Sequence, residues 1–147
     1  MRLKNPFLNA EEEQRVVQAI QQAERDTSGE IRVHIQNRPK ECISAFETTQ
    51  KVFFQLGMDQ TQQRNGVLFY VGVTRHSFTI LGDEGINKTV TTGFWNEIKD
   101  RVIQNFKVQK YCQGLIEGIT IAGQALKTYF PYQKDDINEL PDDISKG

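Results

Sequence analysis

Residues 66–73 read Gly-Val-Leu-Phe-Tyr-Val-Gly-Val, an almost wholly apolar run that follows a polar connection. A central strand that is covered on both faces has this composition, whereas a half-exposed strand alternates polar and apolar residues. Upstream, residues 30–36 (Glu-Ile-Arg-Val-His-Ile-Gln) do alternate with a period of two. Downstream, residues 78–81 follow a connection that is short enough for a hairpin turn. The run therefore predicts the central strand of a small sheet.

Helical periodicity predicts helices before, between and after these strands. The first opens at Ala10, behind Asn9 as N-cap, and carries three glutamates in its first turn. A second is expected from near Glu41 to Leu56, and two more carry apolar stripes over residues 94–106 and 115–130. The fold class that follows is α/β, a three-layer α/β/α sandwich with a small mixed sheet flanked by helices.

Connection lengths predict the strand directions. The connection between the first two strands contains a helix, so these strands should be parallel and the crossover right-handed. The tight connection between the second and third strands makes that pair antiparallel.

Composition limits the class of protein. The chain has 147 residues, a net charge of −1, 25% charged and 37% hydrophobic residues, which fits one globular domain and does not favour a nucleic-acid partner. No apolar stretch is long enough to cross a bilayer and the N-terminus lacks a signal peptide, so a cytoplasmic location is expected. The protein is also expected to be a monomer. We expect the domain to span residues 1–132 and residues 133–147 to form a flexible acidic tail.

Cys42 and Cys112 lack metal-site spacing and are interpreted as structural thiols.

The loop that follows the third strand is acidic. Residues 82–87 read Gly-Asp-Glu-Gly-Ile-Asn, and Asp83, Glu84 and Asn87 would offer side-chain oxygens to a hard cation. Gly, Asp and Asn are also ordinary turn residues, so a solvated turn is the alternative.

The topology brings further polar residues to this loop. Glu30 and Asn65 stand at the starts of the two parallel strands, and the antiparallel third strand delivers Asp83 and Glu84 to the same edge. Together with Asn87, these residues are the predicted metal ligands. Oxygen donors without histidine are typical of Ca²⁺ or Mg²⁺ rather than zinc or copper. Glu97 and Asp100 are further acidic candidates, with exposure on a helix face as the alternative.

Three stretches resemble the TPM domain family. Residues 27–33 (Thr-Ser-Gly-Glu-Ile-Arg-Val) are similar to the family's T-G-x-E-I-x-V motif, residues 64–71 to its D/N-N-G-V-L-L-x-V motif, and residues 82–87 to its G-x-G-L/I-E/N loop. The resemblance runs from about Glu11 to about Phe130, and is strongest to small soluble bacterial members of the Bacteroidetes type. It implies an α/β/α sandwich with an acidic cleft that binds divalent metals. This chain has Arg64 where many members carry an Asp before the Asn-Gly pair.

These features favour a module that binds Ca²⁺ or Mg²⁺ and acts in interaction or assembly, with another protein as a further expected partner. The alternative is a metal-dependent phosphomonoesterase in which Asp83 or Glu84 acts as nucleophile or base. The resemblance suggests this activity because members of the family are often labelled phosphatases. A third hypothesis is that the cleft has no function and that the protein acts through the surface of its helices. His34 and Trp95 are interpreted as packing residues.

Overall fold

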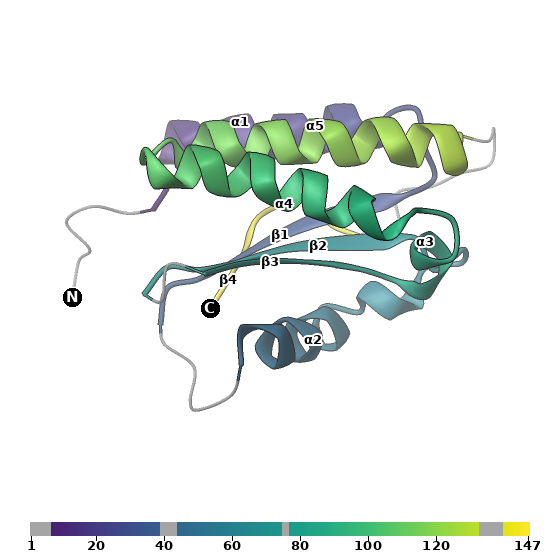
Figure 1. The fold of residues 1–147 in the computed structure, drawn as a ribbon, viewed down its shortest axis with the longest axis horizontal. Helices are drawn as coiled ribbons and strands as arrows, with labels where there is room; N and C mark the ends of the chain where they lie inside the picture. The colour runs from purple at the N-terminus through teal and green to yellow at the C-terminus, as the bar shows by residue number, and fades with distance from the viewer. Residues whose placement is uncertain (1–6, 39–43, 75–76, 133–139) are drawn as a thin grey trace.

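The sheet lies at the centre of the computed structural model, which describes residues 7–38, 44–74, 77–132 and 140–147. Its four strands have the order β3-β2-β1-β4, so the apolar run lies between two neighbours (Figure 1). The strands are β1 (Glu30–Gln36), β2 (Gly66–Gly72), β3 (Ser77–Gly82) and the short β4 (Ser145–Lys146).

The strand directions agree with those predicted. β1 pairs with β2 in parallel, with Glu30 opposite Gly66, and β2 pairs with β3 antiparallel, with Val67 opposite Gly82. The starts of β1 and β2 and the end of β3 therefore lie at one edge of the sheet.

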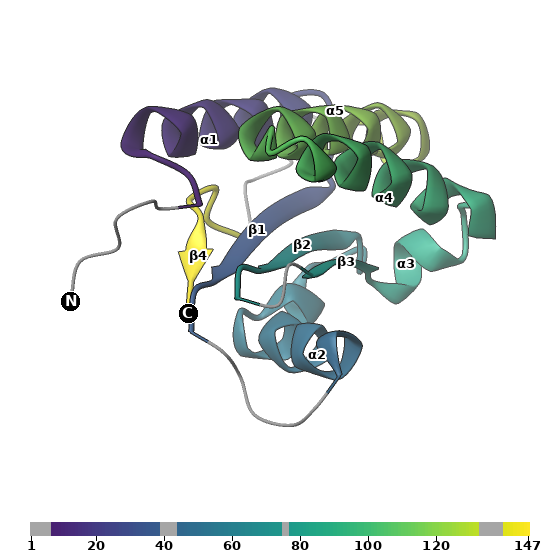
Figure 2. The same ribbon diagram turned by 60° about the vertical axis from the view of Figure 1, so that its left-hand side comes forward.

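Helices cover both faces of the sheet, which confirms the three-layer architecture. α1 (Ala10–Glu24), α4 (Thr92–Lys107) and α5 (Tyr111–Tyr129) lie on one face, and α2 (Ala45–Gln55) lies on the other (Figure 2). A 3₁₀ turn, η1 (Met58–Gln60), follows α2, and the short α3 (Glu84–Asn87) stands at the sheet edge. Within the described residues, no helix is both long enough and apolar enough to span a membrane.

Side chains of β2 alternate between two cores. Val67, Phe69 and Val71 join the core under α1, α4 and α5, whereas Leu68 and Tyr70 join the smaller core under α2. Every residue of β2 is buried. A strand with helices on both faces must be apolar on both, which is why its sequence does not alternate.

The helix starts follow their capping residues. Asn9 and Glu12 form a reciprocal capping box at the start of α1. Ser44 caps α2 by accepting a hydrogen bond from Glu47, so this helix begins at Ala45; the predicted start near Glu41 falls outside the described residues.

The structure describes residues 140–147, which composition predicts to belong to a flexible acidic tail. Residues 133–139 lie outside the described residues, but residues 140–147 run along β1, where Ser145 pairs with His34. Leu140 packs in the core under α2 and Ile144 in the other. The main chain of Gly147 donates to Ile35 at 3.0 Å and accepts from Asn37 at 2.9 Å. The outer edge of β1 thus supplies the hydrogen bonds that bind this segment, and tail composition does not reveal such pairing.

Candidate functional site

The sheet edge that the sequence singles out is built from three strand ends. The main-chain N–H of Glu30 donates to the Asn65 carbonyl at 3.3 Å, and that of Asp83 donates to the Gly66 carbonyl at 2.9 Å. The predicted convergence of Glu30, Asn65 and Asp83 at this edge is therefore present. Their side chains do not, however, all join one cluster.

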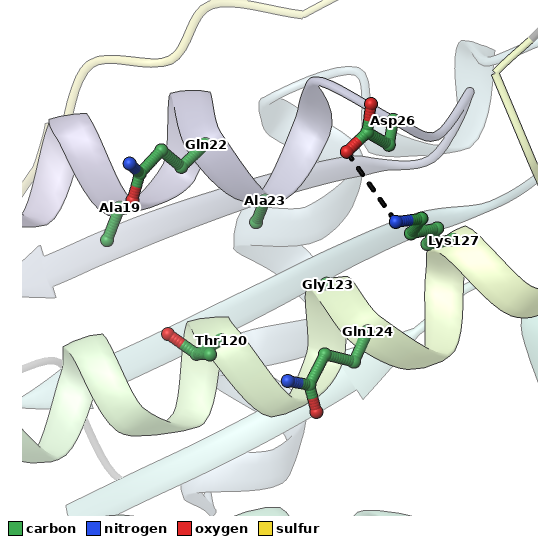
Figure 3. Close-up of a pocket in the computed structure, with 8 residues that line it drawn as sticks. All are labelled: Ala19, Gln22, Ala23, Asp26, Thr120, Gly123, Gln124 and Lys127. Carbon is green, nitrogen blue, oxygen red and sulfur yellow. Dashed lines mark ion pairs between the residues drawn. The ribbon is translucent and has the colours of Figure 1, made fainter.

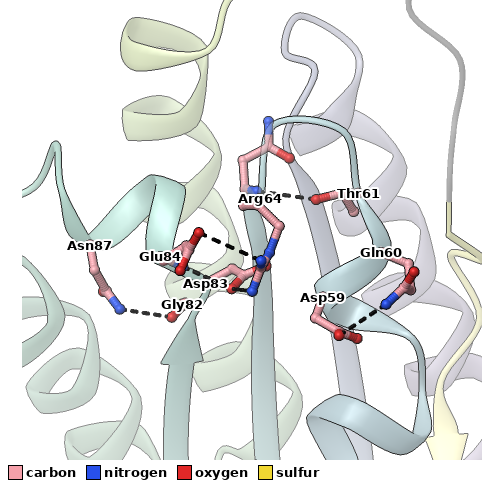
Figure 4. A network of polar contacts seen from close by, with 9 residues as sticks. Asp59, Gln60, Thr61, Arg64, Gly82, Asp83, Glu84 and Asn87 are labelled. Atoms are coloured by element: carbon pink, nitrogen blue, oxygen red, sulfur yellow. Dashed lines mark hydrogen bonds and ion pairs between the residues drawn. The ribbon is translucent and has the colours of Figure 1, made fainter.

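Asp83 is held by an arginine. Its Oδ2 accepts a hydrogen bond from Arg64 Nε at 2.7 Å, and its Oδ1 accepts from Arg64 Nη2 at 2.9 Å. Arg64 Nη1 also lies 3.5 Å from Oε1 of Glu84 (Figure 4). We call these three residues the arginine corner. The side chain of Asp83 is 5% exposed, those of Arg64 and Glu84 39% and 58%, so the fork is a partly buried, charge-assisted pair.

The backbone of the arginine corner is tightly fixed. Arg64 adopts a φ of +52°, a left-handed backbone conformation that residues other than Gly and Asn rarely adopt. Its carbonyl accepts a hydrogen bond from the Gly85 N–H at 2.9 Å. A Cβ at Gly85 would lie 2.2 Å from the Gln63 carbonyl oxygen, so only glycine fits this approach. Asp83 Oδ1 also caps α3 by accepting from the Glu84 N–H at 2.8 Å.

Asn87 and Trp95 close the other side of the loop. The Asn87 side chain donates to the Gly82 carbonyl at 2.9 Å and accepts from Trp95 Nε1 at 3.0 Å. The Trp95 ring lies where a Cβ at Gly82 would be and packs against the larger core, as predicted. Both the donor and the acceptor of the side-chain amide of Asn87, a predicted ligand, therefore form hydrogen bonds that hold the loop.

Asn65 lies deep in the same edge. Its side chain is 1% exposed and donates to Ser28 Oγ at 3.3 Å, while its buried Oδ1 accepts no hydrogen bond from any of the described residues. An acceptor in this state is costly.

Among the described residues, one cluster of acidic side chains has a geometry that could hold a metal ion, and it contains Glu30 and two residues that the sequence did not indicate. Oxygens of Glu24, at the end of α1, of Glu30 and of Asp142 all lie within 4.8 Å of one another. We call it the three-carboxylate group. Glu30 is 2% exposed, and Glu24 and Asp142 are half-buried. The only signal for Glu24 is its place one turn before the Ser28-Gly29 connection, and Asp142 reaches the group only because residues 140–147 lie along β1.

The surroundings of Glu24 favour its protonated form. Burial, the hydrogen bond with Asp142 and the negative charges of Glu30 and Asp142 together raise the pKa of Glu24 to about 11, although the hydrogen bond from the Ile31 N–H lowers it. That N–H donates to Glu24 Oε2 at 2.7 Å. Near neutral pH Glu24 is therefore a neutral acid beside its acidic neighbours.

Other residues considered from the sequence have structural surroundings. His34 is buried, contacts Ser145 Oγ at 2.9 Å and Gln36 Oε1 at 2.8 Å, and stacks on Tyr70, which agrees with a packing role. Glu97 and Asp100 are exposed on α4. Cys112 is buried, and burial raises the pKa of its thiol, so this thiol is a poor nucleophile.

A groove lies on the helical layer, between α1 and α5. It has a volume of about 230 Å³, with Ala19, Ala23 and Gly123 between the two helices and the Asp26–Lys127 ion pair, 3.8 Å long, at one end (Figure 3). Gly123 lets the helices approach closely, because a Cβ there would lie 2.6 Å from that of Ala23.

Comparison with known proteins places the fold among solved structures. Residues 4–125 match the family model described as TPM domain. The BA42 protein of the psychrophilic bacterium Bizionia argentinensis, solved by NMR, is 48% identical over all of both chains, with a TM-score of 0.90. No curated protein matches the chain.

Two more distant structures share the fold alone. The N-terminal domain of a protein from P. gingivalis is 21% identical, with a TM-score of 0.68, over 84% of this chain and 79% of that one. The N-terminal domain of the cg2496 protein from Corynebacterium glutamicum is 11% identical, with a TM-score of 0.64, over 81% and 74%.

Proposed function

The chain belongs to the TPM domain family, and we propose that it binds one Ca²⁺ or Mg²⁺ ion through the three-carboxylate group. The observation that carries the proposal is the approach of the Glu24, Glu30 and Asp142 oxygens to within 4.8 Å of one another. Carboxylates from three separate segments form an all-oxygen donor set, which hard divalent cations prefer.

Electrostatics supports the same group. Three acidic side chains at this distance repel one another when ionised, and the native protein relieves this by keeping a proton on Glu24. A divalent cation would relieve the same repulsion with two positive charges. Main-chain carbonyls and waters would complete the coordination of either ion.

The proposed role is binding in the service of interaction or assembly rather than catalysis. The cation would join the end of α1, the start of β1 and residues 140–147, and would stabilise the fold by mass action. The alternative, a phosphomonoesterase with Asp83 as nucleophile, has less support, because both oxygens of Asp83 bind Arg64.

The test is a titration of metal-stripped protein with Ca²⁺ and with Mg²⁺, followed by calorimetry and amide-resolved NMR. We expect saturable shifts around Glu24, Ile31 and Asp142, with a dissociation constant on the order of 10⁻⁵ to 10⁻³ M. Asp142→Asn should weaken binding about tenfold or more, while the matched control Glu97→Gln, an exposed carboxylate on α4, should leave it unchanged. An absence of saturable binding, or equal binding by Asp142→Asn, would refute the proposal. Hydrolysis of a phosphomonoester by the loaded protein, lost in Asp83→Asn, would favour the alternative.

A further inference from the structure

The sheet edge contains a second set of carboxylates, and a positively charged side chain already occupies it. In the arginine corner, Asp83 and Glu84 are adjacent in sequence and both face the Arg64 guanidinium (Figure 4). We propose that Arg64 acts as a built-in cation that excludes divalent ions from this corner and thereby determines which acidic group of the edge binds metal. The second part of this inference rests on the function proposed above; the first does not.

Hydrogen bonds occupy both carboxylate oxygens of Asp83, the atoms that would bind a metal. Its Oδ2 accepts from Nε of Arg64, and its Oδ1 accepts from both Nη2 of Arg64 and the Glu84 N–H. These three contacts measure 2.7, 2.9 and 2.8 Å, as expected for charge-assisted bonds. A divalent ion bound to Asp83 would compete with the guanidinium for these oxygens and would be repelled by its positive charge.

The backbone conformation at Arg64 does not explain why this residue is an arginine, whereas its charge does. At a φ of +52° glycine is the most favourable residue and asparagine the next, so the chain conformation does not call for arginine. What arginine adds is the planar fork that fits the Asp83 carboxylate and reaches Glu84. The strained backbone of Arg64 is fixed in turn by the bond from the Gly85 N–H to its carbonyl.

This backbone also supplies a clean variant. Arg64→Gly removes the guanidinium and at the same time relaxes the left-handed backbone, so the loop should keep its path. Arg64→Asn serves as a second neutral variant that tolerates the same conformation. Arg64→Lys is the matched control, because it keeps the positive charge and loses only the fork geometry.

The experiment titrates the wild type and these variants with Ca²⁺ and with Mg²⁺, and follows the amides of residues 83–87 separately from those of Glu24, Ile31 and Asp142. We expect Arg64→Gly and Arg64→Asn to gain a saturable response at residues 83–87, with a dissociation constant on the order of 10⁻³ M, as in weak calcium modules. The wild type and Arg64→Lys should show a response at least about tenfold weaker there.

Two outcomes would overturn the inference. One is a response at residues 83–87 that is as strong in the wild type as in the neutral variants. The other is no response there in either neutral variant while the amide spectrum shows that it is folded. The shifts around Glu24, Ile31 and Asp142 in the same spectra test the function proposed above, so failure of one proposal is distinguishable from failure of the other.

Discussion

The arginine corner and the three-carboxylate group lie at one edge of one sheet, yet the protein balances their negative charge in different ways. In the corner, Asp83 is matched by a covalently attached guanidinium at 2.7 and 2.9 Å. In the group, Glu24 retains a proton and forms a hydrogen bond with Asp142. A proton exchanges with solvent and can be replaced by a metal, whereas an arginine leaves only if its side chain moves. The number of carboxylates in a loop is thus a poor guide to a metal site, and the groups that face them are a better one.

The largest effect should come from removing the carboxylate of the corner. Asp83→Ala should lower the free energy of unfolding by about 2–3 kcal/mol, because it removes the cap of α3 and the partner of the Arg64 fork. Chemical denaturation in the presence of a chelator measures this loss. A change below about 0.5 kcal/mol, the size typical of surface substitutions, would mean that the arginine corner contributes little to stability.

The three-carboxylate group should respond to pH instead. The pKa of Glu24 is about 11 in the folded protein against an ordinary value of 4.5, so above pH 4.5 the unfolded chain releases a proton that the native state keeps. The contribution of Glu24 to stability is therefore complete below that pH and is lost progressively as the pH rises towards 11. Glu24→Gln should remove this loss, so the free energy of unfolding of the variant at pH 8 should exceed that of the wild type by an amount that grows with pH.

This prediction is checked by urea titrations of both proteins between pH 5 and pH 9 with a chelator. The difference between variant and wild type should grow with pH, and Glu97→Gln, the exposed control, should show no such growth. Parallel curves for Glu24→Gln and the wild type would contradict the proton that we assign to Glu24.

A smaller loss of stability is expected when the hydrogen bond between Trp95 and Asn87 is removed. Trp95→Phe removes the donor to Asn87 Oδ1 and should cost about 1 kcal/mol. The side-chain amide resonances of Asn87 should shift, while the pH dependence of stability stays that of the wild type. Altered pH dependence in Trp95→Phe would couple two regions that we treat as separate.

The smallest effect should follow Glu84→Gln. This side chain is 58% exposed and its contact with Arg64 is 3.5 Å long, so the change should stay within about 0.5 kcal/mol. A loss as large as that of Asp83→Ala would show that Arg64 is held by Glu84 rather than by Asp83.

Much of the fold follows from local pattern and connection length. The apolar run of β2, the alternation of β1 and the stripes of the long helices each arise from burial of one or two faces. The crossover between β1 and β2 and the tight link to β3 then fix the sheet edge that holds Glu30 and Asp83. Those inferences depend on neighbouring residues and short connections, and the structure confirms them.

The composition of the site depends on contacts that no local pattern encodes. Arg64 and Asp83 are 19 residues apart, and the sequence indicated only that an arginine stands beside Asn65. β4 has two residues and lies in an acidic stretch without apolar period, so its pairing with β1 and the arrival of Asp142 beside Glu30 could not be predicted. The four-residue α3 is too short to show a helical period, so residues 82–87 were predicted to form a loop.

The most direct test of the central claim is one Mg²⁺ or Ca²⁺ titration of the wild type, monitored at the amides of both regions. The account predicts saturable shifts around Glu24, Ile31 and Asp142, with at most weak changes at residues 83–87. Saturable shifts centred on residues 83–87, with none around Glu24 and Asp142, would contradict it and would return the metal site to the loop after β3.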